Sequence, residues 1–557
     1  MFKNTKTDLL FLIGLGIIFF IPFLGGVHLF DWDEINFAEI SREMLLTEDY
    51  LRIYVDFVPF WEKPPLYFWL QALSMKSFGF TEFAARLPNA ICGIITLVFL
   101  YKIGDRLYNR LFGFFWAIVY FGTILPNLYS HSGIIDPWFN LFIFSGLYFF
   151  IQFNWKKNGL DTSLLKSKWI YLFWGGFLIG LGILTKGQVA YLVTCVTFFI
   201  YWIYKRFRFY VNVPEFLFFT FAATLVSLTW YGLETWKNGP WFISEFNKYQ
   251  YRLFSTPDAG HKGFFGYHFA VLLVGCFPAS IFLIRSFFKM PEFQFDYQKD
   301  FTKWMKMFFW VVLILFSVVQ SKIVHYSSLC YFPLTYLATL VIYNMVEQKI
   351  NFDRWIKIGL LSIGGLFVIA TIALPFVGMN SDILKPLFND PFALGNLDAA
   401  VHWSGWDIIP GLFFLTTLVY SIFFLKSKKR ILALFLGTAI FINLTLYFLV
   451  GNIEHHSQRA AIEFFESKAG EDCYIKPMGY KTYAHLWYGK RPNHLPVESR
   501  DIHWLMSEKA DKPVYVITKV HKLKKLAEFG NLREIGRKNG FVFLKKDILL
   551  DQVHPPK

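Results

Sequence analysis

Long apolar runs separated by short polar breaks fill the chain from its start to about residue 450. A helix that crosses a bilayer needs roughly 20 predominantly apolar residues, and about thirteen runs approach that length. They cover residues 8–29, 83–101, 111–129, 136–153, 169–185, 187–204, 211–231, 266–284, 305–320, 326–346, 355–377, 407–425 and 431–450. The pattern predicts a polytopic α-helical membrane protein with about thirteen transmembrane helices. The first run lacks a small-residue cleavage site, so we interpret it as a retained helix and not as a signal peptide.

Basic residues gather in the polar breaks that follow the even-numbered runs. These breaks contain Lys102/Arg106/Arg110, Lys156/Lys157/Lys166/Lys168, Lys205/Arg206/Arg208, Arg285/Lys289/Lys299/Lys303, Lys349/Arg354/Lys357 and Lys426/Lys428/Lys429/Arg430. Because basic breaks remain in the cytoplasm, we expect the chain to begin there and to send residue 451 onward to the outer side. Four outer segments are long, namely 30–82, 232–265, 378–406 and 451–557.

The first outer segment, 30–82, predicts two amphipathic helices that lie at the membrane interface. Phe37, Ile40 and Met44 form the apolar stripe of the first, and Pro64-Pro65 opens the second. The charges on the first helix are interpreted as solvated, and they are Glu39, Arg42 and Glu43.

The tail alternates short apolar strands with helical pieces, as in 473–476, 514–518 and 541–544. Such interleaving predicts a small α/β domain, so the chain divides into a membrane domain, 1–450, and an outer domain, 451–557. The tail contains no glycine-rich phosphate loop, and we therefore expect no nucleotide cofactor.

Composition agrees with a membrane protein, with 55% hydrophobic residues, 17% charged residues and a mean hydropathy of +0.40. The net charge of +15 is concentrated in the cytoplasmic breaks, so it reports topology and predicts no nucleic-acid partner. The five cysteines show no metal-ligand spacing and no evident pairing.

Ionisable side chains from several distant breaks are expected on the outer side. Charges beside hydrocarbon are costly, and such groups usually line a polar cavity. The acids can deprotonate a hydroxyl, or they can bind a divalent cation together with His261. These acids are Asp33, Glu34, Glu62 and Asp136. The cations can hold a phosphate, and they are Lys63, Arg86, Lys186, Arg252 and Lys322. An outward cavity with this content suits a lipid-linked phosphate substrate.

Other interpretations of these residues stay open. Arg86 can anchor the second helix at the interface, and Lys186 and Lys322 can do the same for theirs. His325 also faces outward and can be either packed or functional.

Several motifs that contain these ionisable residues follow one another along the chain in the order known from one protein family. They are Asp33-Glu34-x-x-Phe37-Ala38-Glu39-Ile40-x-Arg42-Glu43-Met44, Glu62-Lys63-Pro64-Pro65-Leu66, Glu82-Phe-Ala-Ala-Arg86-Leu-Pro88, Leu184-Thr-Lys186-Gly187, Asp258-Ala-Gly-His261-Lys262 with Tyr267 and Pro278, and Ser321-Lys322-x-x-His325-Tyr326. Together they resemble the ArnT-like glycosyltransferases, which are the aminoarabinose transferases and their relatives, and more distantly the protein O-mannosyltransferases.

The resemblance implies a GT-C fold and the transfer of a single sugar from a polyprenyl phosphate such as undecaprenyl phosphate. The acceptor would be lipid A, another glycolipid or a protein at the periplasmic face of the bacterial inner membrane. Asp33 matches the catalytic carboxylate, Asp136 a further acid of the cavity, and Lys63 the donor-phosphate contact. Glu62 and His261 match the positions that hold a divalent metal, which would be zinc, magnesium or manganese. We expect the protein to act as a monomer.

Three positions depart from the aminoarabinose transferases. Asn36 stands where they commonly carry Arg, Phe60 where they carry Tyr, and Gln188 where they carry Pro. The sugar and the acceptor therefore stay open. Two other functions are weighed against transfer of one sugar, namely a lipid or polysaccharide flippase or transporter and an oligosaccharide ligase. A transporter places its charges near the bilayer midplane in related halves, whereas these lie at one edge.

Overall fold

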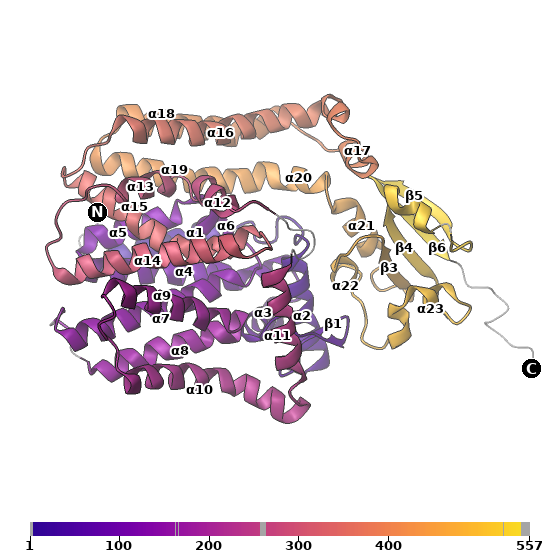
Figure 1. The fold of residues 1–557 in the computed structure, drawn as a ribbon. Coiled ribbons are helices and arrows are strands. Elements are labelled where there is room, and N and C mark those ends of the chain that lie inside the picture. Colours follow the sequence, from indigo (N-terminus) through magenta and orange to yellow (C-terminus); the bar gives the residue numbers. More distant parts are fainter. Residues whose placement is uncertain (1–3, 162, 165, 257–262, 527, 547–557) are drawn as a thin grey trace, which may run out of the picture.

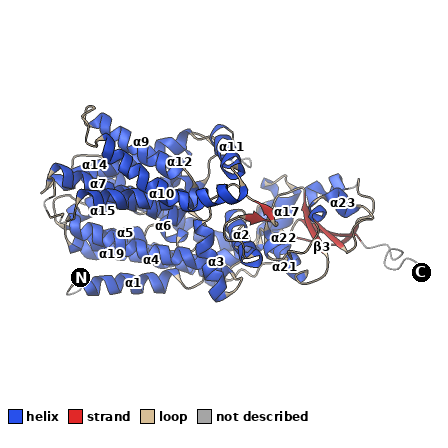
Figure 2. Ribbon diagram, turned by 90° about the horizontal axis from the view of Figure 1, so that it is seen from below, coloured by secondary structure: helices blue, strands red, loops and turns tan. Residues whose placement is uncertain are grey.

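The computed structural model describes residues 4–546 except 162, 165, 257–262 and 527. Long helices lie side by side in a bundle, and a small sheet with short helices stands at one end of it (Figure 1). Seen from below, the sheet remains beyond the same end of the bundle (Figure 2).

A helix, or two or more consecutive helical segments, lies at each of the thirteen predicted apolar runs. In chain order these are α1 (Thr5–Phe20), α4 (Glu82–Leu107), α5 (Arg110–Phe121) with α6 (Ile124–Tyr129), α7 (Asp136–Asn158), α8 (Lys168–Lys186), α9 (Val189–Tyr204), α10 (Val213–Asn238), α12 (Tyr267–Gly275) with α13 (Ala279–Ser286), α14 (Asp296–Val318), α15 (Tyr331–Val346), α16 (Arg354–Met379), α18 (Ile409–Val419), and α19 (Ser427–Thr445), which continues to α20 (Gly451–His455).

Eight helices among the described residues are long and apolar enough to cross a membrane. A ninth span results if α12 and α13, bent by 116° at their junction, are counted as one. α5 and α9 are apolar but shorter. The prediction of a polytopic helical membrane protein is confirmed, and the number thirteen stays a prediction.

Glycines let the backbones of neighbouring helices touch. A Cβ added at Gly104 in α4 would lie 2.6 Å from the Cα of Gly113 in α5. Between α7 and α8, a Cβ at Gly146 would lie 2.9 Å from the carbonyl oxygen of Gly175. Small residues at such crossings allow close packing where lipid provides no hydrophobic force between helices.

The first outer segment forms α2 (Asp33–Thr47), the hairpin β1 (Tyr54–Val55) with β2 (Val58–Pro59), and α3 (Leu66–Phe78). The two predicted helices are present, but the interpretation of solvated charges on the first is wrong. Residues 34–44 of α2 are all buried. Arg42 donates two hydrogen bonds to Glu39, and Glu43 accepts the N–H groups of Asp56 and Phe57. Because each charge has a partner, α2 can be enclosed by protein on every side.

The C-terminal part contains a four-stranded sheet in the order β3-β4-β6-β5. Its strands are β3 (Tyr474–Met478), β4 (Val514–Lys519), β5 (Arg533–Lys538) and β6 (Phe541–Lys546), accompanied by α21 (Arg459–Ser467), α22 (Ala484–Trp487) and α23 (Ile502–Met506). β3 and β4 are parallel, and the other pairs are antiparallel. The division into domains at residue 450 stays a prediction, since the last helical run continues to His455.

The remaining outer segments contribute α11 (Trp241–Ser255) and α17 (Pro391–Leu397). α11, α2 and α3 all lie at the end of the bundle that faces the sheet, and α17 lies next to the sheet (Figures 1 and 2). Predicted outer segments therefore gather at one end of the molecule.

Candidate functional site

Four ionisable side chains from four distant segments meet at the end of the bundle that faces the sheet. The Nε2 atom of His325 lies 3.5 Å from Asp33 Oδ2 and 4.0 Å from Asp136 Oδ2. The Nζ atom of Lys186 lies 2.6 Å from Asp136 Oδ1. The sequence predicted the two acids and the lysine as site residues, and the structure brings them together around His325.

Helix ends position these groups. Asp33 and Asp136 are the first residues of α2 and α7, where the helix dipole favours a negative charge. Lys186 is the last residue of α8, where the dipole favours a positive one. His325 lies in the short helix η2 (Val324–Cys330), directly before α15. Rigid helix termini therefore fix the directions from which the charges converge.

The two acids differ in access. The Asp33 side chain is 32% exposed, whereas the Asp136 side chain is 2% exposed. Asp136 Oδ2 accepts no hydrogen bond among the described residues, and a buried oxygen of this kind calls for an explanation. A substrate hydroxyl or amino group that enters beside His325 would supply the missing donor.

A second group of cations lies against a tyrosine of α11. The Nζ atom of Lys63 lies 5.0 Å from the ring centroid of Tyr249, and the guanidinium of Arg252 lies 5.2 Å from the same centroid. Lys186 is similarly placed over Tyr326, at 5.4 Å. A ring holds an ammonium group without neutralising its charge, so Lys63 can still bind an anion. Glu62 precedes Lys63 and is half-buried.

Glu34, predicted as a catalytic acid, and Arg86, predicted as a phosphate ligand, form a buried pair with each other. Arg86 donates from Nε and a terminal nitrogen to the two carboxylate oxygens of Glu34, at 3.1 and 2.9 Å. Its other hydrogen bonds go to the backbone carbonyls of Leu24, Val27 and His28. With its donors taken up in this way, Arg86 ties α4 to α2.

The charge state of Glu34 follows from these contacts. Burial by itself would raise the pKa of the carboxyl group. The Arg86 guanidinium and the N–H groups of Phe30 and Gly133 outweigh burial and hold the pKa of Glu34 below its ordinary value. Glu34 is therefore ionised and fixed, and it is unsuited to exchanging a proton.

Lys322, predicted as a phosphate contact, caps the end of a helix in the structure. Its Nζ atom donates to the carbonyl oxygens of Phe316, Ser317 and Val319, at the C-terminal end of α14. Lysine commonly satisfies the free carbonyls of a last helical turn. Only 6% of the residue is exposed, and it caps the helix.

The predicted metal ligands are Glu62 and His261, and His261 lies outside the described residues. Within the described part of the chain, no group of three or more His, Cys, Asp and Glu side chains could hold a metal ion. A carboxylate and an imidazole form a donor set that suits zinc or manganese. The metal site stays a prediction.

Known proteins resemble this chain over all or part of its length. Residues 62–230, which include Glu62, Lys63, Asp136 and Lys186, match the family described as dolichyl-phosphate-mannose-protein mannosyltransferase. An undecaprenyl phosphate-alpha-4-amino-4-deoxy-L-arabinose arabinosyl transferase of Photorhabdus laumondii is 24% identical over 565 residues, or 95% of this chain and 96% of that protein. A protein of the same description from Pectobacterium atrosepticum is 25% identical over 420 residues, or 72% of this chain and 70% of that protein.

The fold matches a solved structure along its full length. ArnT from Cupriavidus metallidurans, crystallised with undecaprenyl phosphate, superposes with a TM-score of 0.75 at 15% identity, and the match covers 100% of both chains. Its apo state gives a TM-score of 0.76. The chain is therefore similar in sequence to the ArnT-like glycosyltransferases and has the fold of ArnT. These matches agree with the predicted resemblance.

The site also contains residues that the sequence does not assign to it. The sequence allows His325 to be either packed or functional, although it shares a motif with Lys322. Tyr249 and Tyr326 are hidden among 29 tyrosines, and no charge pattern distinguishes them. Tyr483 comes from the C-terminal part, and only the folded chain brings it near Asp31, whose Oδ1 atom accepts its N–H at 3.5 Å.

Proposed function

We propose that this ArnT-like protein moves a single sugar from undecaprenyl phosphate to a phosphorylated glycolipid such as lipid A. The observation that carries the proposal is the convergence of Asp33, His325 and Asp136 beside Lys63 and Arg252 at one end of the bundle. Transfer from a lipid phosphate requires a carboxylate that the acceptor can reach and cations near the leaving phosphate, and Asp33 and Lys63 are such groups. The names of the relatives and the full-length match to ArnT support the same donor.

The chemistry divides between the two groups of residues. The bond between the sugar C1 and the phosphate oxygen breaks, and the leaving phosphate keeps the electron pair. Lys63 and Arg252 stabilise the resulting charge without having to move. The acceptor oxygen bonds to C1, and Asp33 takes the proton of an acceptor hydroxyl. With a phosphate acceptor no strong base is needed, and Asp33 steadies the positive charge that develops on the sugar.

Topology and metal complete the proposal. We infer thirteen spans and a cytoplasmic N-terminus, so that the site and the domain 451–557 would face the periplasm of a bacterium and the protein would act as a monomer in the inner membrane. Glu62 and His261 would hold the divalent ion, which would add positive charge where the donor phosphate sits. The basic breaks on the opposite side and the outer position of α11 and α17 support this orientation.

The test uses the purified full-length protein with a polyprenyl-phosphate sugar and lipid A. We expect the wild type to add one sugar mass to the acceptor by mass spectrometry, and Asp33→Asn to lower the rate at least about a hundredfold while remaining folded, because the carboxylate acts on the reacting atoms. Asp382→Asn, in an exposed ion pair with Lys385, is the matched control and should retain activity. Full activity in the Asp33 variant, or lipid movement without a new glycosidic bond, would refute the proposal.

A further inference from the structure

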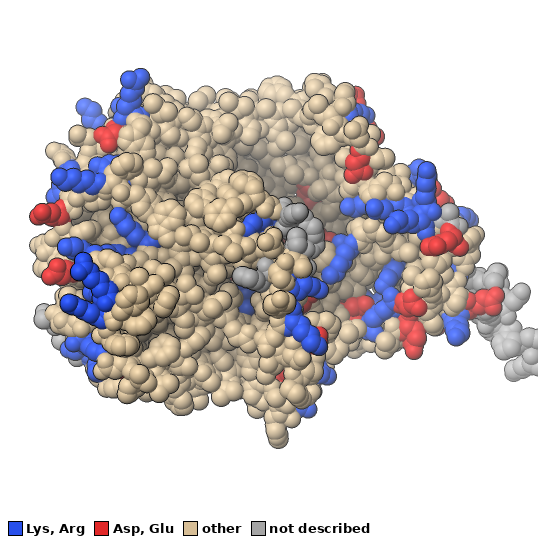
Figure 3. Space-filling view, viewed as in Figure 1, with Lys and Arg blue, Asp and Glu red and all other residues tan. Residues whose placement is uncertain are grey.

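A second set of cations lies on the C-terminal part, near the segment that leads into Asp33. Lys481 follows β3, and Lys519 is the last residue of β4. Lys481 is exposed and Lys519 is half-buried. Figure 3 shows a hollow between the bundle and the C-terminal part, with Lys and Arg side chains along its C-terminal side.

Both lysines rest on aromatic rings. The Nζ atom of Lys481 lies 4.4 Å from the ring centroid of Trp32 and 5.6 Å from that of Tyr483. The Nζ atom of Lys519 lies 4.1 Å from Phe392 and 5.3 Å from Tyr480. Ring faces orient an ammonium group but leave its charge in place, unlike the carboxylate that neutralises Lys186. The two lysines can therefore attract an anion.

Charged side chains of both signs surround Lys519. Asp31 and Asp390 face Lys519, and Lys522 adds a further positive charge there. Asp390 also pairs with His521, at 3.4 Å. Asp31 is accessible to water, yet the surrounding protein raises the pKa of its carboxyl group to about 6. Its negative charge is thus held less firmly than that of an ordinary aspartate.

Tyr483 connects this set to the reaction centre. Its ring packs edge-on against Trp32, with centroids 5.4 Å apart and planes at 86°. Burial raises the pKa of the Tyr483 phenol first, and the negative charges of Glu62, Asp31 and Asp33 raise it further. The phenol therefore lies near enough to feel the charges of Glu62 and Asp33, which belong to the reaction centre, and of Asp31.

We propose that Lys481 and Lys519 form an anion site for the phosphate of the glycolipid acceptor, with Trp32 and Tyr483 as the face against which its sugar packs. The inference rests on the proposed function, and it assigns the residues that would bind the acceptor of that reaction. Transfer brings two phosphorylated partners to Asp33. Lys63 and Arg252 face the leaving phosphate of the donor, and the lysines of the C-terminal part face the other partner.

The experiment uses full-length protein in nanodiscs of zwitterionic lipid, with lipid A and chemically dephosphorylated lipid A as probes. The double variant K481Q/K519Q should raise the KM for lipid A about tenfold, as expected for two lost charge contacts, while kcat and the donor KM stay unchanged. The preference of the wild type for phosphorylated lipid A should disappear in the variant. Added salt should weaken lipid A binding to the wild type more than to the variant.

Lys509→Gln is the matched control, because Lys509 is exposed and follows α23 in the chain. Figure 1 shows that α23 lies away from α17 and the bundle. An unchanged lipid A KM in the double variant, or an altered donor KM, would overturn the inference. A loss confined to binding of phosphatidylglycerol vesicles would also overturn it, since the lysines would then read the membrane surface. Direct titration of lipid A onto wild type and variant decides the inference even if no transfer is observed, whereas absent transfer in the wild type counts against the proposed function.

Discussion

At the scale of single residues, a charged side chain that can take part in the reaction differs from a structural one in how many hydrogen-bond partners it already has. Asp33 is partly open, and Asp136 Oδ2 accepts no hydrogen bond among the described residues. Glu34 directly follows Asp33 and is surrounded by donors, whereas Lys322, shortly before His325, is surrounded by carbonyl acceptors. A buried ion whose contacts are complete stabilises the fold only as long as its partner remains.

Arg86 gives the sharpest test of this distinction. Replacing Arg86 by Gln or Glu34 by Gln leaves one charge buried without its partner, and each change should cost about 3–5 kcal/mol of stability. The double replacement should cost less than the sum of the two, because neither charge is then left alone. Thermal unfolding in detergent measures all three variants. If Arg86 instead bound donor phosphate, Arg86→Gln would raise the donor KM at unchanged stability.

The sequence could predict the residue types of the site but not their pairing. Helix ends, outward topology and family motifs were enough to find Asp33, Lys63, Asp136 and Lys186. The same reasoning also included Glu34, Arg86 and Lys322, because a free and a paired charge look alike in a sequence. Arg86 and Glu34 are 52 residues apart in the sequence, and Arg86 also donates to three backbone carbonyls of the loop after α1. Only the folded loop reveals this arrangement.

At the scale of elements, the pattern of apolar runs predicts where the membrane helices lie. The close crossings between these helices occur at glycines, as at Gly104 and Gly113. The run lengths predicted where helices lie because the bilayer sets that length. They did not reveal that α2 is enclosed, since its charges are compensated by Asp56, Phe57 and the chain around Arg491. Tertiary contacts overrode the amphipathic pattern at this helix.

Gly113→Ala tests the close crossing of α4 and α5. The added Cβ would lie 2.7 Å from the backbone nitrogen of Asp105 and still closer to the carbonyl oxygen of Tyr101. Backbone cannot yield as a flexible side chain does, so we expect a loss of about 1–3 kcal/mol by overpacking. Gly365→Ala in α16 is the control, because a Cβ there meets nothing within 4 Å. Equal thermal stability of the two variants would contradict a tight crossing.

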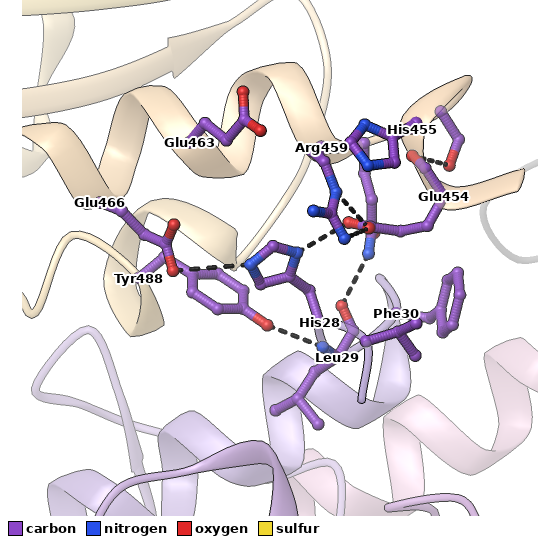
Figure 4. Close-up of polar contacts among 12 residues, drawn as sticks. His28, Leu29, Phe30, Glu454, His455, Arg459, Glu463, Glu466 and Tyr488 are labelled. Atoms are coloured by element: carbon purple, nitrogen blue, oxygen red, sulfur yellow. Dashed lines mark hydrogen bonds and ion pairs between the residues drawn. The ribbon is translucent and has the colours of Figure 1, made fainter. Parts of the chain in front are cut away.

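At the scale of the whole molecule, the C-terminal part is held to the bundle through the segment between α1 and α2. His28 Nδ1 lies 2.9 Å from Glu454 Oε1, and Arg459 Nε donates to the other oxygen of Glu454 at 2.6 Å (Figure 4). The N–H of Leu29 donates to the hydroxyl of Tyr488 at 2.7 Å. Since this segment leads directly into Asp33, the same contacts set where Lys481 and Tyr483 stand relative to the reaction centre.

Glu454→Gln should loosen this junction without unfolding the bundle. The carboxylate is fully buried, and its replacement by an amide removes two charge-assisted contacts and places an amide donor against His28 or Arg459. Hydrogen exchange in 474–546 and at 28–33 should become faster, while exchange in α7 and α8 stays the same. Glu463→Gln on the same helix α21 is the control, because Glu463 pairs only at the surface, with Lys538. If the C-terminal part merely rests beside the bundle, both variants will exchange alike.

If the C-terminal part positions the acceptor, the lipid A KM will rise in Glu454→Gln alone, because Lys481 and Tyr483 are then held less firmly beside Asp33.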